Sequence, residues 1–255
     1  MGRMISRGWR ILGTGLSFAL FGAGGLVMGL LVFPALRLLP GEASERELRA
    51  QRLVHHCFRL FVGVMEVLGV LRVTVRGEDR LRQAGGQLVV ANHPTLLDVV
   101  MIGALLPQLD CVVKREAWSN PFLRWVVTAT GYIPNDLGDT LVGACAERLR
   151  RGRALLLFPE GTRSPKGGLG RFQRGAAHAA LRSWRPLLPV FIRCDPPSLS
   201  GREHWYQVPE RKMHFSIEAG EVVDPTLLAE PGEPRGAAAR RITAALRGFY
   251  EKRLR

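Results

Sequence analysis

The sequence has few cysteines and none of the cysteine spacings that hold metals. Its 255 residues include four cysteines, and no two of them form a Cys-x-x-Cys pair: Cys57, Cys111, Cys145 and Cys194. They fall mostly within apolar runs, which is typical of buried free thiols in a reducing compartment. The sequence therefore predicts no metal site and no bound cofactor.

Acidic residues are also scarce relative to basic ones. There are 22 Asp and Glu against 36 Lys and Arg, which gives a formal net charge of +14. Such an excess favours nucleic acid, anionic lipid or phosphorylated ligands as partners. Helix-turn-helix, zinc-finger and ribonucleoprotein patterns are absent and the N-terminus is strongly apolar, so we expect no nucleic-acid partner. The bilayer surface fits this charge better.

Repeats and low-complexity segments are absent too, and 47% of the residues are hydrophobic. A chain of this length and composition forms one globular domain with a short appendage. We predict membrane-anchoring helices in residues 1–69 and an α/β domain in residues 70–255.

The appendage begins with a long uncharged run. Residues 11–36 contain no charge over 26 positions, and a helix of that length measures about 39 Å, enough to cross a hydrocarbon core of about 30 Å. A signal peptide is the alternative, but no clear small-residue cleavage site follows. Arginines flank both ends, at Arg7, Arg10 and Arg37, so charge does not fix the orientation.

A second apolar segment follows at residues 48–71, with helical spacing but several interrupting charges. Such a helix lies at a membrane interface more readily than it crosses. We predict a helical pair that dips into the cytoplasmic leaflet of the inner membrane, with the catalytic domain facing the cytoplasm. The alternative is a full span with the N-terminus outside.

After Gly69 the pattern alternates between short β-branched runs and longer helical stretches. We expect strands at residues 72–76, 88–91, 111–114, 154–158, 188–193 and 213–219, and helices at residues 95–106, 121–130, 140–151, 175–184 and 236–253. Alternation with nearly continuous apolar strands predicts an α/β fold whose mostly parallel sheet is covered by helices on both faces.

The first functional motif, Asn92-His93-Pro94-Thr95-Leu96-Leu97-Asp98, lies where a strand would give way to a helix. Across that turn the Asp98 carboxylate would reach the His93 imidazole, and a histidine held in this way acts as a general base on a hydroxyl. No Gly-x-Ser-x-Gly elbow supplies a nucleophilic serine. The pattern favours direct activation of a substrate hydroxyl, as in acyl transfer without an acyl-enzyme.

The second motif follows the expected strand at residues 154–158 and reads Phe158-Pro159-Glu160-Gly161-Thr162-Arg163-Ser164. A glycine-containing turn with exposed amides and a guanidinium suits a phosphate. Open α/β sheets bind ligands beyond the carboxyl ends of their strands. If the two strands are neighbours, the base and the phosphate site meet.

The two motifs, in this order and spacing, resemble the glycerolipid acyltransferase family, which includes the lysophosphatidic acid acyltransferases. The resemblance extends over about residues 70–224, with further matches at residues 172–176 and 188–190. It implies that His93 is the catalytic base and Asp98 its partner. It also implies a substrate-binding turn formed by Glu160, Gly161, Thr162 and Arg163. Glu160 either contacts substrate or orders the turn.

The resemblance implies an acyltransferase that moves a fatty acyl group to a hydroxyl of a lysophospholipid-like acceptor, of the lysophosphatidic acid type. Acyl-CoA or acyl carrier protein would be the co-substrate, and no cofactor is needed. The bilayer, the acceptor and the carrier protein are the expected partners. We expect the acyl chain to lie along the helix after His93, near Val99, Met101 and Leu105.

One block departs from the family. Many members that acylate glycerol phosphates carry an arginine where this chain reads Gly131-Tyr132-Ile133-Pro134-Asn135-Asp136. Candidate replacements for this cation are Lys114, Arg115, Arg171 and Arg174. Two alternatives stay open: O-acylation of a non-phosphate lipid of the ornithine-lipid or polyene type, and a catalytically silent lipid-binding scaffold. The intact His93, Asp98 and Arg163 argue against the scaffold.

Overall fold

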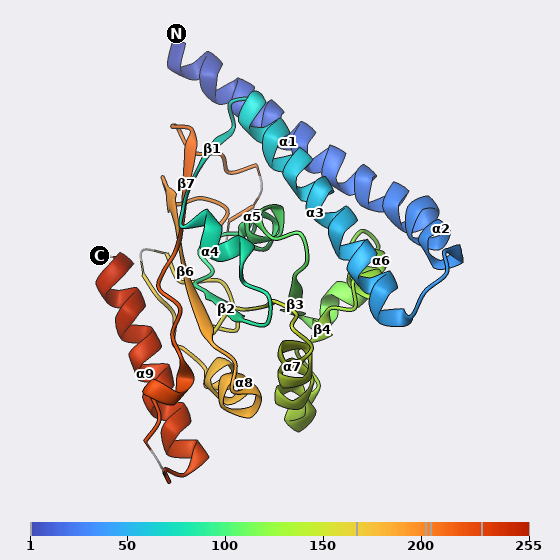
Figure 1. Ribbon diagram of the computed structural model, residues 1–255. Coiled ribbons are helices and arrows are strands. Elements are labelled where there is room, and N and C mark those ends of the chain that lie inside the picture. Colours follow the sequence, from blue (N-terminus) through green and yellow to red (C-terminus); the bar gives the residue numbers. More distant parts are fainter. Residues whose placement is uncertain (1, 167, 202, 205, 231, 255) are drawn as a thin grey trace.

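The computed structural model describes residues 2–166, 168–201, 203–204, 206–230 and 232–254. Its centre is a seven-stranded sheet in the order β1-β7-β6-β2-β5-β3-β4 (Figure 1). The strands are β1 Leu71–Arg76, β2 Leu88–Ala91, β3 Asp110–Val113, β4 Ile133–Pro134, β5 Leu155–Leu157, β6 Leu187–Asp195 and β7 Met213–Ala219. Neighbours are parallel except β6 and β7, which are antiparallel. The predicted mostly parallel sheet is confirmed.

Helices cover both faces of this sheet. They are α1 Gly2–Val27, α2 Phe33–Leu38, α3 Ala43–Val67, α4 Glu78–Arg82, α5 Asp98–Leu105, α6 Arg124–Ala129, α7 Leu141–Arg150, α8 Gly175–Ser183 and α9 Arg235–Leu254. The helices α1, α3 and α5 lie on one face, and α8 and α9 lie on the other (Figure 1). This two-sided arrangement confirms the predicted α/β fold.

The central strands β2 and β5 are apolar at every position because each contributes to two cores. In β2, Leu88 and Val90 are buried in the cluster under α8 and α9, whereas Val89 is buried in the cluster under α3 and α5. Consecutive side chains of a strand point to opposite faces, so a strand covered on both sides reads as a continuous apolar run.

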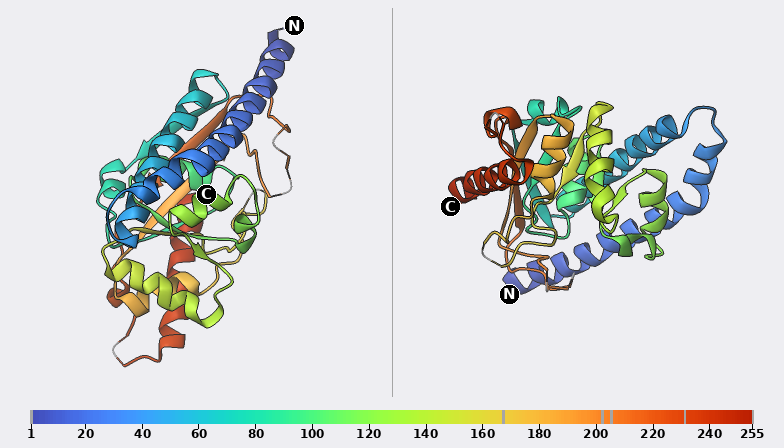
Figure 2. Two further views of the ribbon diagram at one scale, coloured as in Figure 1. Left: turned by 90° about the vertical axis from the view of Figure 1, so that its right-hand side faces the viewer. Right: turned by 90° about the horizontal axis from the view of Figure 1, so that it is seen from below.

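The N-terminal segment is one long helix followed by a returning one. α1 continues through a π-helical turn, Met28–Val32, into α2. Pro34 has no N–H to donate to the preceding turn, and a widened turn is a common way to accommodate that loss. The chain reverses at Gly41, whose φ is 132°, and α3 returns alongside α1 (Figure 2). The predicted helical pair is therefore present.

Only one side of α1 packs against protein. The glycine of the following π-helical turn allows close approach, since a Cβ on Gly29 would lie 2.4 Å from the Trp125 ring. Large apolar side chains remain exposed on the pair: Trp9, Ile11, Leu12, Leu16, Leu20, Leu26, Val27, Leu30, Leu31, Leu60 and Val67. Residues Arg7–Leu38 are long and apolar enough to cross a membrane, with 17% of the most apolar window buried. An uncovered apolar face of this size is typical of membrane association.

The predicted boundary between residues 69 and 70 falls in the turn from α3 to β1, but α3 shares the core of the α/β domain. Its side chains Val54, Phe58 and Met65 are buried in the same cluster as Met101 and Ile102 of α5. The anchor is therefore packed against the body rather than tethered to it.

A charged cluster strengthens this junction. Glu47 of α3 forms ion pairs with Arg148 and, at 2.8 Å, with Arg153. Arg153 lies 2.7 Å from Asp110, which is fully buried, and Gln51 donates to that carboxylate at 2.9 Å. Burial raises the pKa of Asp110. Burial would also raise the pKa of Glu47, but the two arginines more than offset it and the pKa is lowered.

Glu47→Gln should destabilise the protein in a pH-dependent manner. A carboxyl whose folded-state pKa lies below its ordinary 4.5 stabilises the fold above that pH and loses the effect as the pH falls through the folded value. We expect a loss of about 1–2 kcal/mol in the free energy of unfolding at neutral pH, shrinking below about pH 4.5. Denaturant unfolding in detergent micelles, at neutral pH and below about pH 4.5, measures this free energy for the parent and the variant.

Glu78→Gln is the matched control because it removes the exposed ion pair to Arg82. Such surface pairs contribute about 0–1 kcal/mol. An equal loss for Glu47→Gln at both pH values would contradict the ion-pair explanation.

Candidate active site

The turn after β2 is pinned to the neighbouring strand. Asn92 is buried, and its side-chain amide donates to the carbonyl of Ile192 and accepts from the N–H of Ile192, both at 2.8 Å. These two bonds continue the β2–β6 ladder through a side chain. Asn92 thus fixes the point at which His93 leaves the sheet.

His93 and Asp98 form the predicted pair. The Nδ1 atom of His93 lies 2.8 Å from the Asp98 carboxylate, which is completely buried. Thr95 donates to the same carboxylate from its N–H at 2.7 Å and its hydroxyl at 2.6 Å. Burial raises the pKa of Asp98, while the donors from His93 and Thr95 lower it. An Nδ1–H bonded to a carboxylate leaves Nε2 to accept a proton.

The imidazole is also held from the side. The ring of Phe158, at the end of β5, stacks on His93 with a centroid separation of 4.1 Å. Because β2 and β5 are parallel neighbours, the two motif turns emerge at the same edge of the sheet. The expected meeting of the motifs is present in the structure.

Glu160 joins the two turns through hydrogen bonds. It is 5% exposed, and its carboxylate accepts from the N–H of His93 at 3.0 Å, the hydroxyl of Ser164 at 2.7 Å and the N–H of Gly170 at 2.6 Å. In return the N–H of Ser164 donates to the carbonyl of His93 at 2.7 Å. Glu160 is not among the residues lining the adjacent cavity. Of its two predicted roles, this position favours ordering the turn over contacting substrate.

Glu160→Gln should lower kcat more than it changes the KM for the acceptor. In glutamine an NH₂ group replaces one of the two carboxylate oxygens. This donor would face an N–H or O–H donor, the hydrogen bond would be lost, and the two turns would separate. We expect a loss of kcat of about 10- to 100-fold, measured by steady-state transfer assays. Glu221→Gln, at an exposed position, is the control. A change confined to the acceptor KM would instead support direct substrate contact.

His93 opens into a cavity of about 550 Å³. Lys114, Gly161, Thr162 and Arg163 line it together with His93. One guanidinium nitrogen of Arg163 donates to the carbonyls of Leu199 and Ser200, at 3.3 and 2.9 Å. The cavity therefore combines the imidazole of His93 with two cations and one carboxylate, that of Glu116.

Of the four candidate cations, Lys114 lines this cavity, whereas Arg115, Arg171 and Arg174 are not among its lining residues. Arg115 instead lies 3.8 Å from Asp136, in the segment of residues 131–136 that departs from the family pattern. Asn135 of that block does line the cavity. Lys114 is thus the candidate that the structure brings to the site.

The expected path for an acyl chain is only partly present. Val99 lines the active-site cavity, but Met101 is buried in the core and Leu105 packs against that core. A separate apolar cavity of about 290 Å³ lies between α1, α3 and α6, and Leu123 lines both cavities. The prediction placed the apolar space along α5 because sequence spacing does not reveal how the anchor packs.

Comparison with known proteins decides the family. A model of the acyltransferase family matches residues 72–193, which include both motif turns. Curated relatives extend the similarity over most of the chain. A 1-acyl-sn-glycerol-3-phosphate acyltransferase from Pseudomonas aeruginosa is 26% identical over 231 residues, covering 88% of this chain and 84% of the relative. The chain belongs to the acyltransferase family.

The name of a second relative specifies an acceptor other than 1-acyl-sn-glycerol-3-phosphate. A lyso-ornithine lipid O-acyltransferase from Pseudomonas aeruginosa is 34% identical over 181 residues, covering 69% of this chain and 66% of the relative. The crystal structure of the 1-acyl-sn-glycerophosphate acyltransferase PlsC from Thermotoga maritima matches with a TM-score of 0.65 and 20% identity, covering 97% of both chains. That structural likeness concerns the fold alone.

Acyltransferase chemistry needs supporting residues that the sequence motifs only partly identified. Thr95 donates to Asp98, Ser164 links the two turns and Phe158 stacks on the His93 ring. Thr95 lies three residues before Asp98, a spacing typical of a local side-chain bond, so it could have been found. In the part of the chain that the structure describes, no group of three His, Cys, Asp or Glu side chains is placed to hold a metal ion.

Proposed function

We propose that this acyltransferase moves a fatty acyl group from a thioester donor, acyl-CoA or acyl carrier protein, to the free hydroxyl of a lysophosphatidic acid-like acceptor. The observation that carries this is the placement of His93 in one cavity with Arg163 and Lys114. A base beside two cations suits an acceptor whose hydroxyl lies a few bonds from a phosphate. The thioester is a co-substrate, and no bound cofactor is needed.

The reaction follows from the geometry of His93. Its Nε2 takes the proton of the acceptor hydroxyl while the oxygen attacks the thioester carbonyl, and buried Asp98 stabilises the imidazolium. The resulting oxyanion collapses, the carbon–sulfur bond breaks, and the imidazolium returns the proton to the departing sulfur. An ester and a free thiol are the products. His93 ends neutral and no acyl-enzyme forms.

The membrane arrangement follows from the exposed apolar face of the helical pair. We place the pair in the cytoplasmic leaflet of the inner membrane, with the α/β domain in the cytoplasm, where activated acyl donors occur. The acyl chain would pass Leu123 into the apolar cavity between the helices. A lipid acceptor then reaches His93 without leaving the membrane surface.

Removing a cation tests the acceptor assignment. Arg163→Gln and Lys114→Met should each raise the KM for lysophosphatidic acid about tenfold, because each removes a charge-assisted bond to phosphate, with a smaller effect on kcat. Arg115→Met is the matched control, since Arg115 adjoins Lys114 in sequence but is not among the lining residues. An unchanged KM in both variants would place the phosphate elsewhere.

A lyso-ornithine lipid is the second candidate acceptor. It is favoured by the 34% identity to a lyso-ornithine lipid O-acyltransferase and by the absence of an arginine from residues 131–136. This acceptor has no phosphate, so Lys114→Met should leave its KM unchanged. Parallel assays with both acceptors separate the candidates. The intact pair of His93 and Asp98 and the family membership argue against a silent scaffold.

A further inference from the structure

The outward face of α3 carries three basic side chains in a row, Arg52, His56 and Arg59, all of them exposed. At about 100° per residue they fall within an arc of about 60° on the helix surface, and they span about 10 Å along its axis. We call this row the α3 stripe. It lies on the side of the helix away from Val54 and Met65, which are buried in the core of the α/β domain.

The two arginines of the α3 stripe have no acidic partner. Within the ranges that the structure describes, the side chains of Arg52 and Arg59 form no ion pair and no hydrogen bond. The acidic side chains on the same face of the helix are engaged elsewhere. Glu45 lies 3.5 Å from Arg49, and Glu66 accepts a backbone N–H at 3.0 Å. Each of these carboxylates is also seven residues, about 10 Å along the axis, from the nearer arginine of the stripe.

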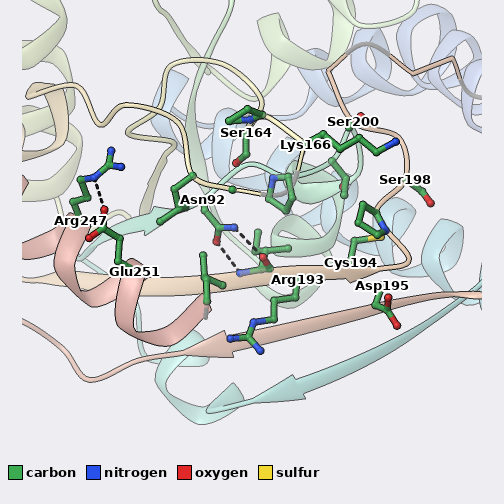
Figure 3. A pocket seen from close by; sticks show the side chains of 18 residues that line it. Asn92, Ser164, Lys166, Arg193, Cys194, Asp195, Ser198, Ser200, Arg247 and Glu251 are labelled. Atoms are coloured by element: carbon green, nitrogen blue, oxygen red, sulfur yellow. Dashed lines mark hydrogen bonds and ion pairs between the residues drawn. The ribbon is translucent and has the colours of Figure 1, made fainter.

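Three arginines of α9, by contrast, are ion-paired. Arg247 pairs with Glu251 at 2.7 Å, and the two side chains lie together at the edge of a cavity beside α9 (Figure 3). Arg241 and Arg253 pair with acidic residues that lie outside α9. Exposed guanidinium groups without such partners attract an anion more strongly than neutralised ones. The α3 stripe is therefore a surface suited to an anionic partner.

The α3 stripe borders the exposed apolar surface of the helical pair. Leu60 follows Arg59 directly and is 70% exposed, and Leu20 of the neighbouring α1 is 51% exposed (Figure 2). Both leucines line the apolar cavity between the two helices, so the exposed apolar surface continues from α1 onto α3 at this point. Residues 11–36 carry no charge. The charge of this surface therefore begins at the α3 stripe.

A bilayer leaflet presents the same sequence of chemistry, hydrocarbon bordered by phosphate. Basic side chains beside an apolar helix face lie at the level of the lipid headgroups, where they attract anionic lipids. A guanidinium also offers a phosphate two parallel hydrogen-bond donors. An acidic protein would match the charge of the stripe but would not account for the apolar surface beside it. The observations therefore favour a lipid surface.

We propose that the α3 stripe binds the headgroup phosphates of anionic phospholipids in the leaflet that holds α1. The proposal rests on the membrane placement proposed above and not on the identity of the acceptor. Because α3 shares a core with α5, which begins at Asp98, contacts of the stripe with headgroups also set the depth of the catalytic turn at the membrane surface.

Competition between two kinds of vesicle tests the lipid class. Purified protein would be incubated with equal amounts of phosphatidylcholine vesicles and of mixed phosphatidylcholine–phosphatidylglycerol vesicles until its distribution is constant, and the two populations would then be separated by density. The parent should favour the anionic population. The double variant Arg52→Gln, Arg59→Gln should lower this distribution ratio about 25-fold, or about fivefold for each arginine. High salt should lower the ratio of the parent in the same direction.

Two further double variants are the controls. Arg182→Gln with Arg240→Gln removes the same charge from exposed positions of α8 and α9, on the opposite face of the sheet (Figure 1). This variant should keep the parental ratio, because salt screens charges over about 8 Å. Arg52→Lys with Arg59→Lys keeps the charge of the stripe and should stay within about twofold of the parent.

Four outcomes overturn the proposal. A parental ratio in the glutamine variant of the stripe would show that its arginines do not contact headgroups, and an equal loss in the α8 and α9 control would indicate a response to net charge alone. Loss of the preference in the lysine variant would indicate damage to α3. An unchanged ratio together with a raised KM for acyl carrier protein alone would assign the stripe to that carrier. Failure of the parent to bind either population would instead refute the proposed membrane placement.

Discussion

His93→Ala should reduce acyl transfer by at least about a thousandfold while membrane association stays intact. The loss follows because the imidazole is the group in the cavity that is positioned by a buried carboxylate to accept a proton. The anchor does not depend on this side chain, since its apolar face lies on α1 and α3. Transfer assays on purified protein, with vesicle flotation in parallel, measure both.

The matched control is His178→Ala on α8, which lies on the opposite face of the sheet from α3 and α5. It should retain parental activity. Turnover by His93→Ala within tenfold of the parent would mean that another group acts as the base.

Asp98→Asn should produce the second largest loss, a fall in kcat of about 100- to 1,000-fold. Three donors, from His93 and Thr95, converge on this carboxylate, and an asparagine amide cannot accept from all of them. The imidazole would lose both its orientation and the charge that stabilises the imidazolium. The KM values for donor and acceptor should change little, which steady-state kinetics can establish.

Because Asp98 is completely buried, unfolding must be measured alongside activity. Asp139→Asn makes the same chemical change at an exposed position and is the control, which should keep the parental stability and kcat. A folded Asp98→Asn protein with parental kcat would show that the carboxylate does not assist the base.

The sequence patterns were most informative where burial is two-sided. β2 and β5 read as apolar runs because alternate residues enter different cores, and the structure places both within a residue of the expected limits. The two-residue strand β4 and the five-residue helix α4 were not predicted, since such short elements have no measurable period. The antiparallel pairing of β6 with β7 was not predicted, because it depends on the path of the long connection between them, which no local sequence pattern indicates.

The candidate site was predictable to the extent that its contacts are local. The bond from His93 to Asp98 joins residues five apart and follows from the turn. The bond from Asn92 to Ile192 joins residues 100 apart, and the position of Lys114 depends on how β3 lies beside β5. Spacing along the chain therefore predicted the pairing of His93 with Asp98, while the selection among the four candidate cations needed the fold.

The most direct test of the central claim is acyl transfer by the purified, folded protein in vesicles. Labelled acyl-CoA and labelled acyl carrier protein would be offered with lysophosphatidic acid and with lyso-ornithine lipid, for the parent and for His93→Ala. We expect a labelled ester of lysophosphatidic acid, released thiol, dependence on His93 and no label on the protein. Absence of ester with every acceptor, or label covalently attached to the protein as an intermediate, would contradict direct acyl transfer by His93.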